Sequence, residues 1–258
     1  YLVEKAARIL PDEDQEVGEL FAKLLAEQKG VSVLTQTRLL TAQKEGLLRK
    51  VTFSRGGVEK TMKVDEILLT TGRAPTVDIG LENATVAYSP KGIEVNEHLQ
   101  TSAKSIYAAG DVLGNKRYLH TALLESRVAA HNLLHKQKIS PDYFGTPNVT
   151  YTFPGIASVG LREDDCIKRD LTIRTAVAPL TMVARANTSD FRDGFVKLIT
   201  DKKGILLGAT VIAPHAGEII HELALAIRHH MHAADLATMP HAFLSWSEAV
   251  RVAAARLG

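Results

Sequence analysis

The segment Thr101-Ser102-Ala103-Lys104-Ser105-Ile106-Tyr107-Ala108-Ala109-Gly110-Asp111-Val112 is the part of the chain from which its architecture can be inferred. Its apolar residues predict a strand that runs directly into Gly110 and Asp111, and open α/β sheets bind cofactors at the carboxyl ends of their strands. Gly110 has no Cβ, so a ligand can approach its backbone, and the carboxylate of Asp111 only accepts hydrogen bonds. The pair therefore suits a hydroxylated ligand such as a sugar or a ribitol chain, although a turn that caps the next helix would have the same sequence.

A helix is predicted after a short polar loop, beginning with Tyr118, Leu119 and His120 and running to about His135. The backbone N–H groups at its amino end carry a partial positive charge. They suit the electron-rich pyrimidine edge of a flavin, and the helix dipole would favour the anionic reduced ring. These features describe how a flavin could be held and do not by themselves identify one.

The segment 101–112 resembles the second flavin-binding motif, T..IYAAGDV, of the FAD-dependent pyridine nucleotide-disulfide oxidoreductases. Lipoamide dehydrogenase, glutathione reductase and mercuric reductase belong to this family. The resemblance implies that Asp111, next to Gly110, holds the ribitol of FAD and that Tyr118, Leu119 and His120 meet its pyrimidine edge.

The beginning of the chain predicts the second half of a βαβ nucleotide-binding unit, with a strand at Tyr1–Glu4, a helix that ends at Gly30, and a strand after it. In such units an acidic residue at the end of the second strand accepts hydrogen bonds from the adenosine ribose, and Glu4 has this position. The family pattern VTLVE.....LP..D.E matches the segment from Tyr1 to Glu16. Glu4 therefore indicates NAD(H), while Lys5 and Arg8 leave NADP(H) open.

Alternating residues around Ser54-Arg55-Gly56-Gly57 predict a hairpin, and the apolar run Val64–Thr71 predicts a buried parallel strand. The run ends in Thr71-Gly72-Arg73-Ala74-Pro75, which matches the family's (A/T)TGR.P motif. By this resemblance Gly72 lets the dinucleotide approach the backbone and Leu39 touches the adenine. Residues 1–76 are thus expected to be the second part of an NAD-binding domain.

The remaining chain is expected to hold two further domains. Residues 77–140 resemble the returning C-terminal part of the FAD-binding domain, and residues 146–258 resemble the family's dimerisation domain. An antiparallel sheet with helices on one face is expected in the latter. Its predicted elements are a helix after Leu161, helices at about 216–231 and at 247–257, and strands at 148–152, 156–161, 171–177, 194–200 and 205–212. The predicted fold class is α/β, with partial Rossmann-type regions for NAD and FAD followed by an α+β dimerisation domain. The resemblance further implies a homodimer, and an upstream Gly-rich turn and cysteine pair that this C-terminal fragment lacks.

The last domain departs from the family at one site. Disulfide reductases carry an H-P-T-x-S-E pattern whose His is a general acid/base and whose Glu orients it. The matching residues here are Phe243 to Glu248, so Glu248 is kept and the His position is Phe243, whose ring transfers no protons. His241 lies two residues earlier and is the alternative acid/base. Mercuric reductase has Tyr at this place, but it ends in a cysteine pair and this chain ends in Arg256-Leu257-Gly258.

Composition limits the other classes of function. The 258 residues include 45% hydrophobic residues, carry a formal net charge of +2 and contain one cysteine, Cys166. The single cysteine excludes an internal disulfide, and the near-neutral charge gives no reason to expect nucleic acid as partner. Because the sequence shows no apolar run long enough to cross a bilayer and no amino-terminal signal, a cytoplasmic protein without a membrane partner is expected. The histidines at 221, 229, 230 and 232 lack the spacing of a metal site, so none is expected.

The predicted function is that of a flavoprotein fragment whose parent passes a hydride from NAD(P)H to FAD and on to a disulfide, a metal or another acceptor. The 258-residue chain alone is expected to be inactive. Two alternatives stay open: a non-catalytic dimerisation fragment, and a lipoamide-dehydrogenase-type enzyme in which His241 replaces the usual base.

Overall fold

The computed structural model describes residues 1–115 and 117–258, and within helix α1 it leaves out the side chains of Gln28 and Lys29. The chain divides into two compact units: residues 1–68 with 147–258, called unit 1, and residues 69–146, called unit 2. The three-domain division expected from the sequence stays a prediction.

The main sheet of unit 1 is antiparallel and has the strand order β10-β11-β12-β9-β8. Its strands are β8 (Asn148–Thr150), β9 (Gly155–Gly160), β10 (Ile173–Pro179), β11 (Phe195–Asp201) and β12 (Leu206–Ala213). The five strands predicted for this region are confirmed to within a few residues. The turn at residues 201–204 joins β11 to β12 in antiparallel register, with Phe195 opposite Ile212.

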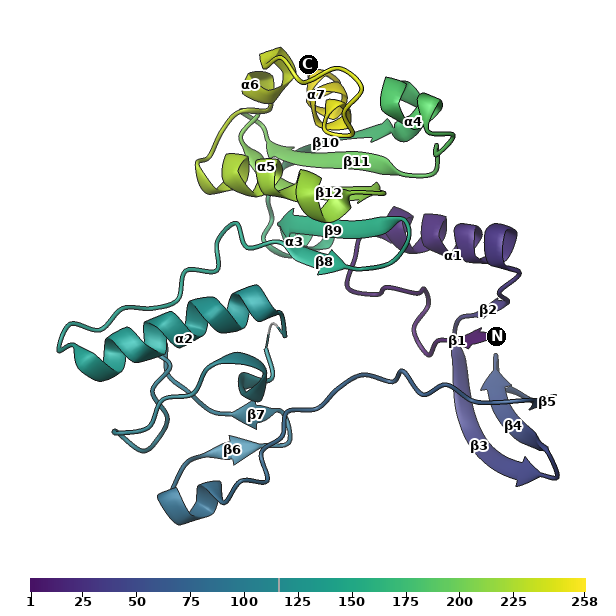
Figure 1. Ribbon diagram of the computed structural model, residues 1–258, viewed down its shortest axis with the longest axis vertical. Helices are drawn as coiled ribbons and strands as arrows, with labels where there is room; N and C mark the ends of the chain where they lie inside the picture. The colour runs from purple at the N-terminus through teal and green to yellow at the C-terminus, as the bar shows by residue number, and fades with distance from the viewer. Residues whose placement is uncertain (116) are drawn as a thin grey trace. The chain divides into compact units, whose positions relative to one another are not determined.

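Helices α5 (Ala216–Arg228) and α7 (Glu248–Ala255) pack on one face of this sheet (Figure 1). The expectation of helices on one face alone was incomplete, because α1 (Gln15–Lys29) covers strand residues of the other face. The contact joins three side chains of α1 to three of the sheet: Val17, Phe21 and Leu24 with Ile156, Phe195 and Ile212. Alternate residues of β11 therefore point into two different cores.

Shorter elements complete this part of unit 1. They are α3 (Glu163–Lys168), η3 (Leu180–Met182), α4 (Ala184–Thr188) and α6 (Ala233–Thr238). The helix expected after Leu161 is α3, whereas α4 and α6 were not predicted.

The beginning of the chain forms the expected βαβ half. Strands β1 (Leu2–Val3) and β2 (Val33–Leu34) pair in parallel, with Leu2 opposite Val33, and α1 connects them. Gly30 ends α1 in the left-handed conformation at φ 63°, and its N–H donates to the carbonyl of Leu25. Glycine adopts this conformation without a steric penalty, as the sequence predicted.

A three-stranded antiparallel sheet follows, made of β3 (Thr37–Glu45), β4 (Leu48–Arg55) and β5 (Val58–Val64). The β4–β5 hairpin was predicted, but β3 was missed. The strand predicted at Val64–Thr71 was wrong: residues 66–71 belong to no strand, and Leu68 and Leu69 are 86% and 72% exposed. A parallel strand needs a hydrogen-bonded neighbouring strand, and among the described residues no strand pairs with residues 66–71.

Unit 2 contains helix α2 (Leu119–Leu134), the short pair β6 (Tyr88–Ser89) and β7 (Gly92–Ile93), and two 3-10 helices, η1 (Leu81–Ala84) and η2 (Gly110–Leu113). The predicted helix at 118–135 is confirmed. The strand predicted before Gly110 was wrong in extent, because it is reduced to one bridge between Gln100 and Tyr107. A small apolar core still fixes this segment, since Ala108 packs with Leu113 and Val128.

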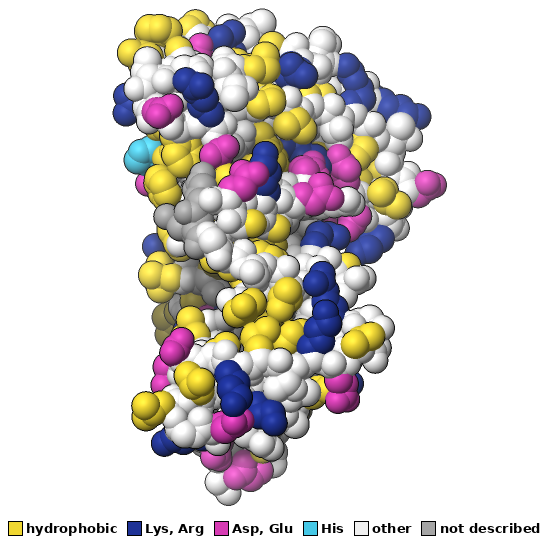
Figure 2. Space-filling model, turned by 90° about the vertical axis from the view of Figure 1, so that its right-hand side faces the viewer, with side chains coloured by type: hydrophobic (Ala, Val, Ile, Leu, Met, Phe, Trp, Pro, Cys, Tyr) yellow, Lys and Arg dark blue, Asp and Glu magenta, His cyan; other side chains and the backbone are white. Residues whose placement is uncertain are grey.

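The surface bears both signs of charge. Figure 2 shows acidic and basic side chains interspersed with hydrophobic ones over the face drawn. None of the helices in the described part of the chain combines the length and apolar character that a bilayer crossing requires.

Candidate cofactor site

The Gly110–Asp111 pair forms the first turn of η2. Gly110 is buried and has φ 81°, a left-handed conformation that other residues rarely adopt. A Cβ at Gly110 would lie 3.2 Å from the Cβ of Ala122 on α2. The glycine therefore allows both the turn and its close approach to the helix.

Strand β7 also packs closely against η2. A Cβ built on Gly92, in β7, would lie 2.6 Å from the backbone carbon of Leu113, the last residue of η2. The turn closes with a hydrogen bond from Gly114 N–H to the carbonyl of Asp111, at 3.0 Å. With its backbone fixed in this way, Asp111 presents an exposed side chain at the surface of unit 2.

The amino end of α2 follows four described residues after η2. Tyr118 has an extended backbone conformation and precedes the first helical residue, and its ring stacks on that of His120 with the centroids 5.3 Å apart. Leu119 is 78% exposed. The hydroxyl of Thr121 is buried and has no hydrogen-bond partner among the described residues.

One residue at this site was not found from the sequence. Glu125 of α2 is 1% exposed, and its Oε2 accepts a hydrogen bond from Gly110 N–H at 2.6 Å. Its Oε1 accepts from the phenol of Tyr143 at 2.7 Å. A glutamate in a helix is usually solvated, and only its place four residues after the small residue Thr121 and three after Ala122 hinted at a buried face.

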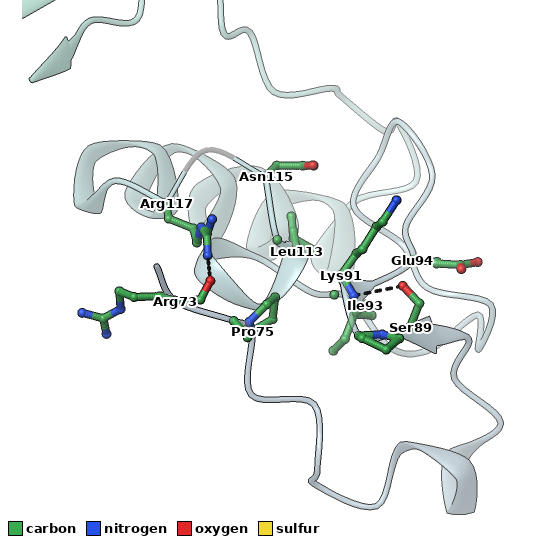
Figure 3. Close-up of a pocket in the computed structure, with 13 residues that line it drawn as sticks. Arg73, Pro75, Ser89, Lys91, Ile93, Glu94, Leu113, Asn115 and Arg117 are labelled. Carbon is green, nitrogen blue, oxygen red and sulfur yellow. Dashed lines mark hydrogen bonds between the residues drawn. The ribbon is translucent and has the colours of Figure 1, made fainter. Parts of the chain in front are cut away.

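A pocket of about 400 Å³ lies beside this turn (Figure 3). Its lining includes Pro75, Ile93, Leu113 and Arg117, whose guanidinium donates to the carbonyl of Arg73. The pocket contains neither Gly110 nor Asp111, so it adjoins the predicted cofactor contacts without including them. Figure 3 shows the side chains of Arg73 and Lys91 pointing in different directions, which argues against a focused anion site.

The predicted NAD contacts fall in both units. Glu4 and Leu39 belong to unit 1, and Gly72 belongs to unit 2. Glu4 is partly buried and accepts a hydrogen bond from Ala6 N–H at 2.7 Å, so one carboxylate oxygen already stabilises the chain after β1. Leu39 is 44% exposed, and Gly72 has φ 107°. These three residues stay predicted contacts.

The segment at the family's acid/base position presents Phe243, which is 77% exposed. The His241 side chain is only 4% exposed, and its Nε2 lies 2.8 Å from Glu222 Oε1 on α5. Glu248 lies at the start of α7, with Oε1 3.3 Å from Arg251 Nη2. Its Oε2 is buried and has no hydrogen-bond partner among the described residues.

The described residues contain neither a group that could hold a metal ion nor a reactive thiol. No group of three or more His, Cys, Asp or Glu side chains there has an arrangement that could hold a metal ion. Cys166 is buried in α3, and burial raises the pKa of its thiol, which disfavours the reactive thiolate.

The known proteins that this chain resembles include dihydrolipoyl dehydrogenases and mercuric reductases. The chain is 37% identical over 231 residues to dihydrolipoyl dehydrogenase of Staphylococcus aureus, covering 88% of this chain and 49% of that protein. It is 31% identical over 257 residues to mercuric reductase of Bacillus cereus, covering 98% of this chain and 40% of that protein. The crystal structure of LpdA from Mycobacterium tuberculosis superimposes with a TM-score of 0.87 at 28% identity, covering 99% of this chain and 56% of that one. The chain thus spans about half the length of the curated relatives it matches.

Two family descriptions together cover nearly all of the sequence. Residues 146–254 match the dimerisation domain of the pyridine nucleotide-disulphide oxidoreductases. Residues 1–131 match the description pyridine nucleotide-disulphide oxidoreductase itself. With the Gly110–Asp111 turn in place before α2, this chain belongs to the pyridine nucleotide-disulphide oxidoreductase family.

Proposed function

We propose that the whole protein is a homodimeric flavoprotein oxidoreductase that passes a hydride from NAD(P)H to FAD and then delivers electrons to an acceptor. The family and the relatives above depend on FAD and NAD(P). FAD supplies the redox chemistry when bound, because its ring accepts a hydride and releases electrons singly or in pairs. The match of residues 146–254 to a dimerisation domain supports the homodimer.

The observation that carries this proposal is the placement of Asp111. Its exposed carboxylate follows a buried, left-handed Gly110 and lies on a turn packed against α2. A carboxylate so placed accepts hydrogen bonds from ribitol hydroxyls, and the amino end of α2 orients the flavin pyrimidine through Tyr118, Leu119 and His120.

For the nicotinamide cofactor we favour NADH. Glu4 follows β1 directly, and its carboxylate would accept hydrogen bonds from ribose hydroxyls. Arg8, a candidate for binding the additional phosphate of NADPH, already donates its guanidinium to the carbonyl of Glu13 at 3.0 Å. Leu39, as a contact to the adenine, and Gly72, as a backbone contact to the dinucleotide, are proposed from the family resemblance alone.

Phe243 limits the kinds of electron acceptor that we propose. A phenyl ring at the acid/base position cannot protonate a thiolate leaving group, so an acceptor that needs no proton from this position is favoured, such as a metal ion or another electron acceptor. The lipoamide-type alternative requires His241 to act instead, and the enclosure of its ring against Glu222 weighs against that role.

The test uses the full-length protein. We expect it to purify with a flavin absorption spectrum, and we expect Asp111→Ala to raise the dissociation constant for FAD about 10- to 100-fold, because a hydrogen bond to a charged group is worth about 1.5–3 kcal/mol. Asp78→Asn, which changes another exposed aspartate of unit 2, is the matched control.

Two results would contradict the proposal. A colourless wild-type protein that also refuses added FAD would favour the non-catalytic dimerisation fragment. FAD affinity equal in the wild type and in Asp111→Ala would show that this carboxylate has no part in the site.

A further inference from the structure

Glu125 is a buried carboxylate on α2 in unit 2. It is 1% exposed, and an ionised carboxylate is costly to bury unless hydrogen bonds replace its water. Gly110 N–H donates to its Oε2 at 2.6 Å, and the phenol of Tyr143 donates to its Oε1 at 2.7 Å. The carboxylate therefore joins the Gly110–Asp111 turn to the segment that leads out of unit 2.

The position of Glu125 on α2 explains how it reaches the turn. Ala122 and Glu125 are three residues apart, so they lie on one helical face. Ala122 is the residue that a Cβ at Gly110 would approach to 3.2 Å. The same face thus sets both the distance of the turn from α2 and the hydrogen bond to its first N–H.

That first N–H has no acceptor within its own helix. Gly110 begins η2, and the opening N–H groups of any helix must find partners elsewhere. Glu125 is 15 residues away in the sequence and supplies the acceptor that a capping side chain would normally provide. Asp111 is the next residue, so the direction of its side chain depends on this bond.

We propose that Glu125 is a positioning residue, which fixes the Gly110–Asp111 turn so that Asp111 can accept from the ribitol of FAD, while Tyr143 holds the Glu125 carboxylate in place. The inference rests on the proposed function, since it requires FAD at Asp111. Burial and the hydrogen bond to Glu125 raise the pKa of Tyr143 above its usual range, so the phenol stays a donor at all physiological pH values.

The experiment compares four variants of the full-length protein. Glu125→Leu removes both hydrogen bonds, and Tyr143→Phe removes one. Glu125→Gln can keep both, because its oxygen can accept from Gly110 while its amide N–H donates to the Tyr143 oxygen. Ser126→Ala, at an exposed neighbour on α2, is the matched control.

Two measurements are made on each variant: the dissociation constant for FAD, and the rate of amide hydrogen exchange in the segment 106–114 without FAD. For Glu125→Leu we expect both to rise at least about tenfold, which corresponds to about 1.4 kcal/mol. Tyr143→Phe should give a smaller rise in both quantities. Glu125→Gln should stay within about threefold of the wild type in both, which corresponds to less than about 0.7 kcal/mol. A merely structural role would lower the melting temperature without singling out this segment.

The inference is overturned if Glu125→Leu exchanges and binds FAD as the wild type does. Should Glu125→Leu fail to fold, Tyr143→Phe decides, and unchanged exchange and affinity in that variant overturn the inference. A wild type that binds no FAD contradicts the proposed function, whereas normal FAD binding by every variant at position 125 contradicts only this inference.

Discussion

The ammonium of Lys197 lies 2.8 Å from the carboxylate of Asp14, and both side chains are almost fully buried, at 1% and 4% exposure. Glu16 and Glu163 also contact this ammonium, at 2.5 and 2.9 Å. Lys197 is on β11 two residues after Phe195, so it points to the face that α1 covers. The cluster ties the amino end of α1 to the sheet of the dimerisation domain.

The charge of Lys197 is expected to be essential for the stability of unit 1. Burial lowers the pKa of Lys197, but Asp14, Glu16 and Glu163 outweigh this effect and raise it above its usual range. Lys197→Met would leave these carboxylates close together without a counter-charge. Removing one partner of a buried pair costs about 3–5 kcal/mol, an upper bound here because Glu16 and Glu163 are 37% and 40% exposed.

Urea unfolding of the 258-residue chain measures this cost. Lys202→Met, which removes an exposed lysine from the β11–β12 turn, should change the free energy of unfolding by less than about 0.5 kcal/mol. Equal stabilities of the two variants would show that the cluster contributes nothing.

Glu13 should make the stability depend on pH in the direction opposite to a typical carboxylate. Burial raises its pKa above the ordinary 4.5, while the hydrogen bond from Ser158 and the charge of Arg162 oppose the rise. The folded chain therefore holds this proton more tightly than the unfolded chain. The stability it contributes is fully present below pH 4.5 and is lost as the pH rises through the folded-state pKa.

Glu13→Gln removes this titration. The free energy of unfolding of the variant should therefore rise relative to that of the wild type as the pH is raised from about 4 to 8, a range that includes the titration of a carboxylate with a raised pKa. The measurement is the free energy of unfolding of both proteins at steps across this range. The exposed Glu19→Gln on α1 is the control and should show no such trend. A difference between Glu13→Gln and the wild type that is constant with pH would contradict the assignment.

Whether the segment 241–248 transfers protons, or has only a structural role, can be tested in the full-length protein. Because His241 is enclosed and bonded to Glu222, we expect His241→Ala to lower the melting temperature and leave the shape of the rate–pH profile unchanged. Phe243→His places an imidazole at an exposed position and should add a pH-dependent limb near the ordinary histidine pKa of about 6.5.

Steady-state rates with a disulfide acceptor and with a dye from pH 5 to 9, roughly the interval around that pKa, provide the measurement. Loss of a limb in His241→Ala would restore His241 as the acid/base and support the lipoamide-type alternative. The wild type and Glu222→Gln serve as references, since Glu222→Gln keeps the contact with His241 but removes the charge.

Much of the fold follows from local patterns. The strands of the main sheet, helices α1, α2, α5 and α7 and the left-handed Gly30 cap were all predicted from periodicity and glycine placement. Of the candidate site, Gly110 and Asp111 could be predicted, because a glycine without Cβ and a carboxylate next to it in the sequence indicate a ligand contact without knowledge of the tertiary structure. The run Val64–Thr71 failed because an apolar segment becomes a strand only when another strand accepts its hydrogen bonds.

By itself, then, the sequence determined most of the helices and the strands of the main sheet, where the Gly-Asp turn lies and which family the motif resembles, because these depend on residues close together in the chain. Tertiary structure alone decided that Glu125 and Lys197 are buried, since each is a charged residue whose local pattern predicts solvent. Glu125 meets Gly110 from 15 residues away, and Lys197 meets Asp14 from the other of the two chain segments that form unit 1. A charge is buried only where distant parts of the chain bring partners to it, and no local pattern records those partners.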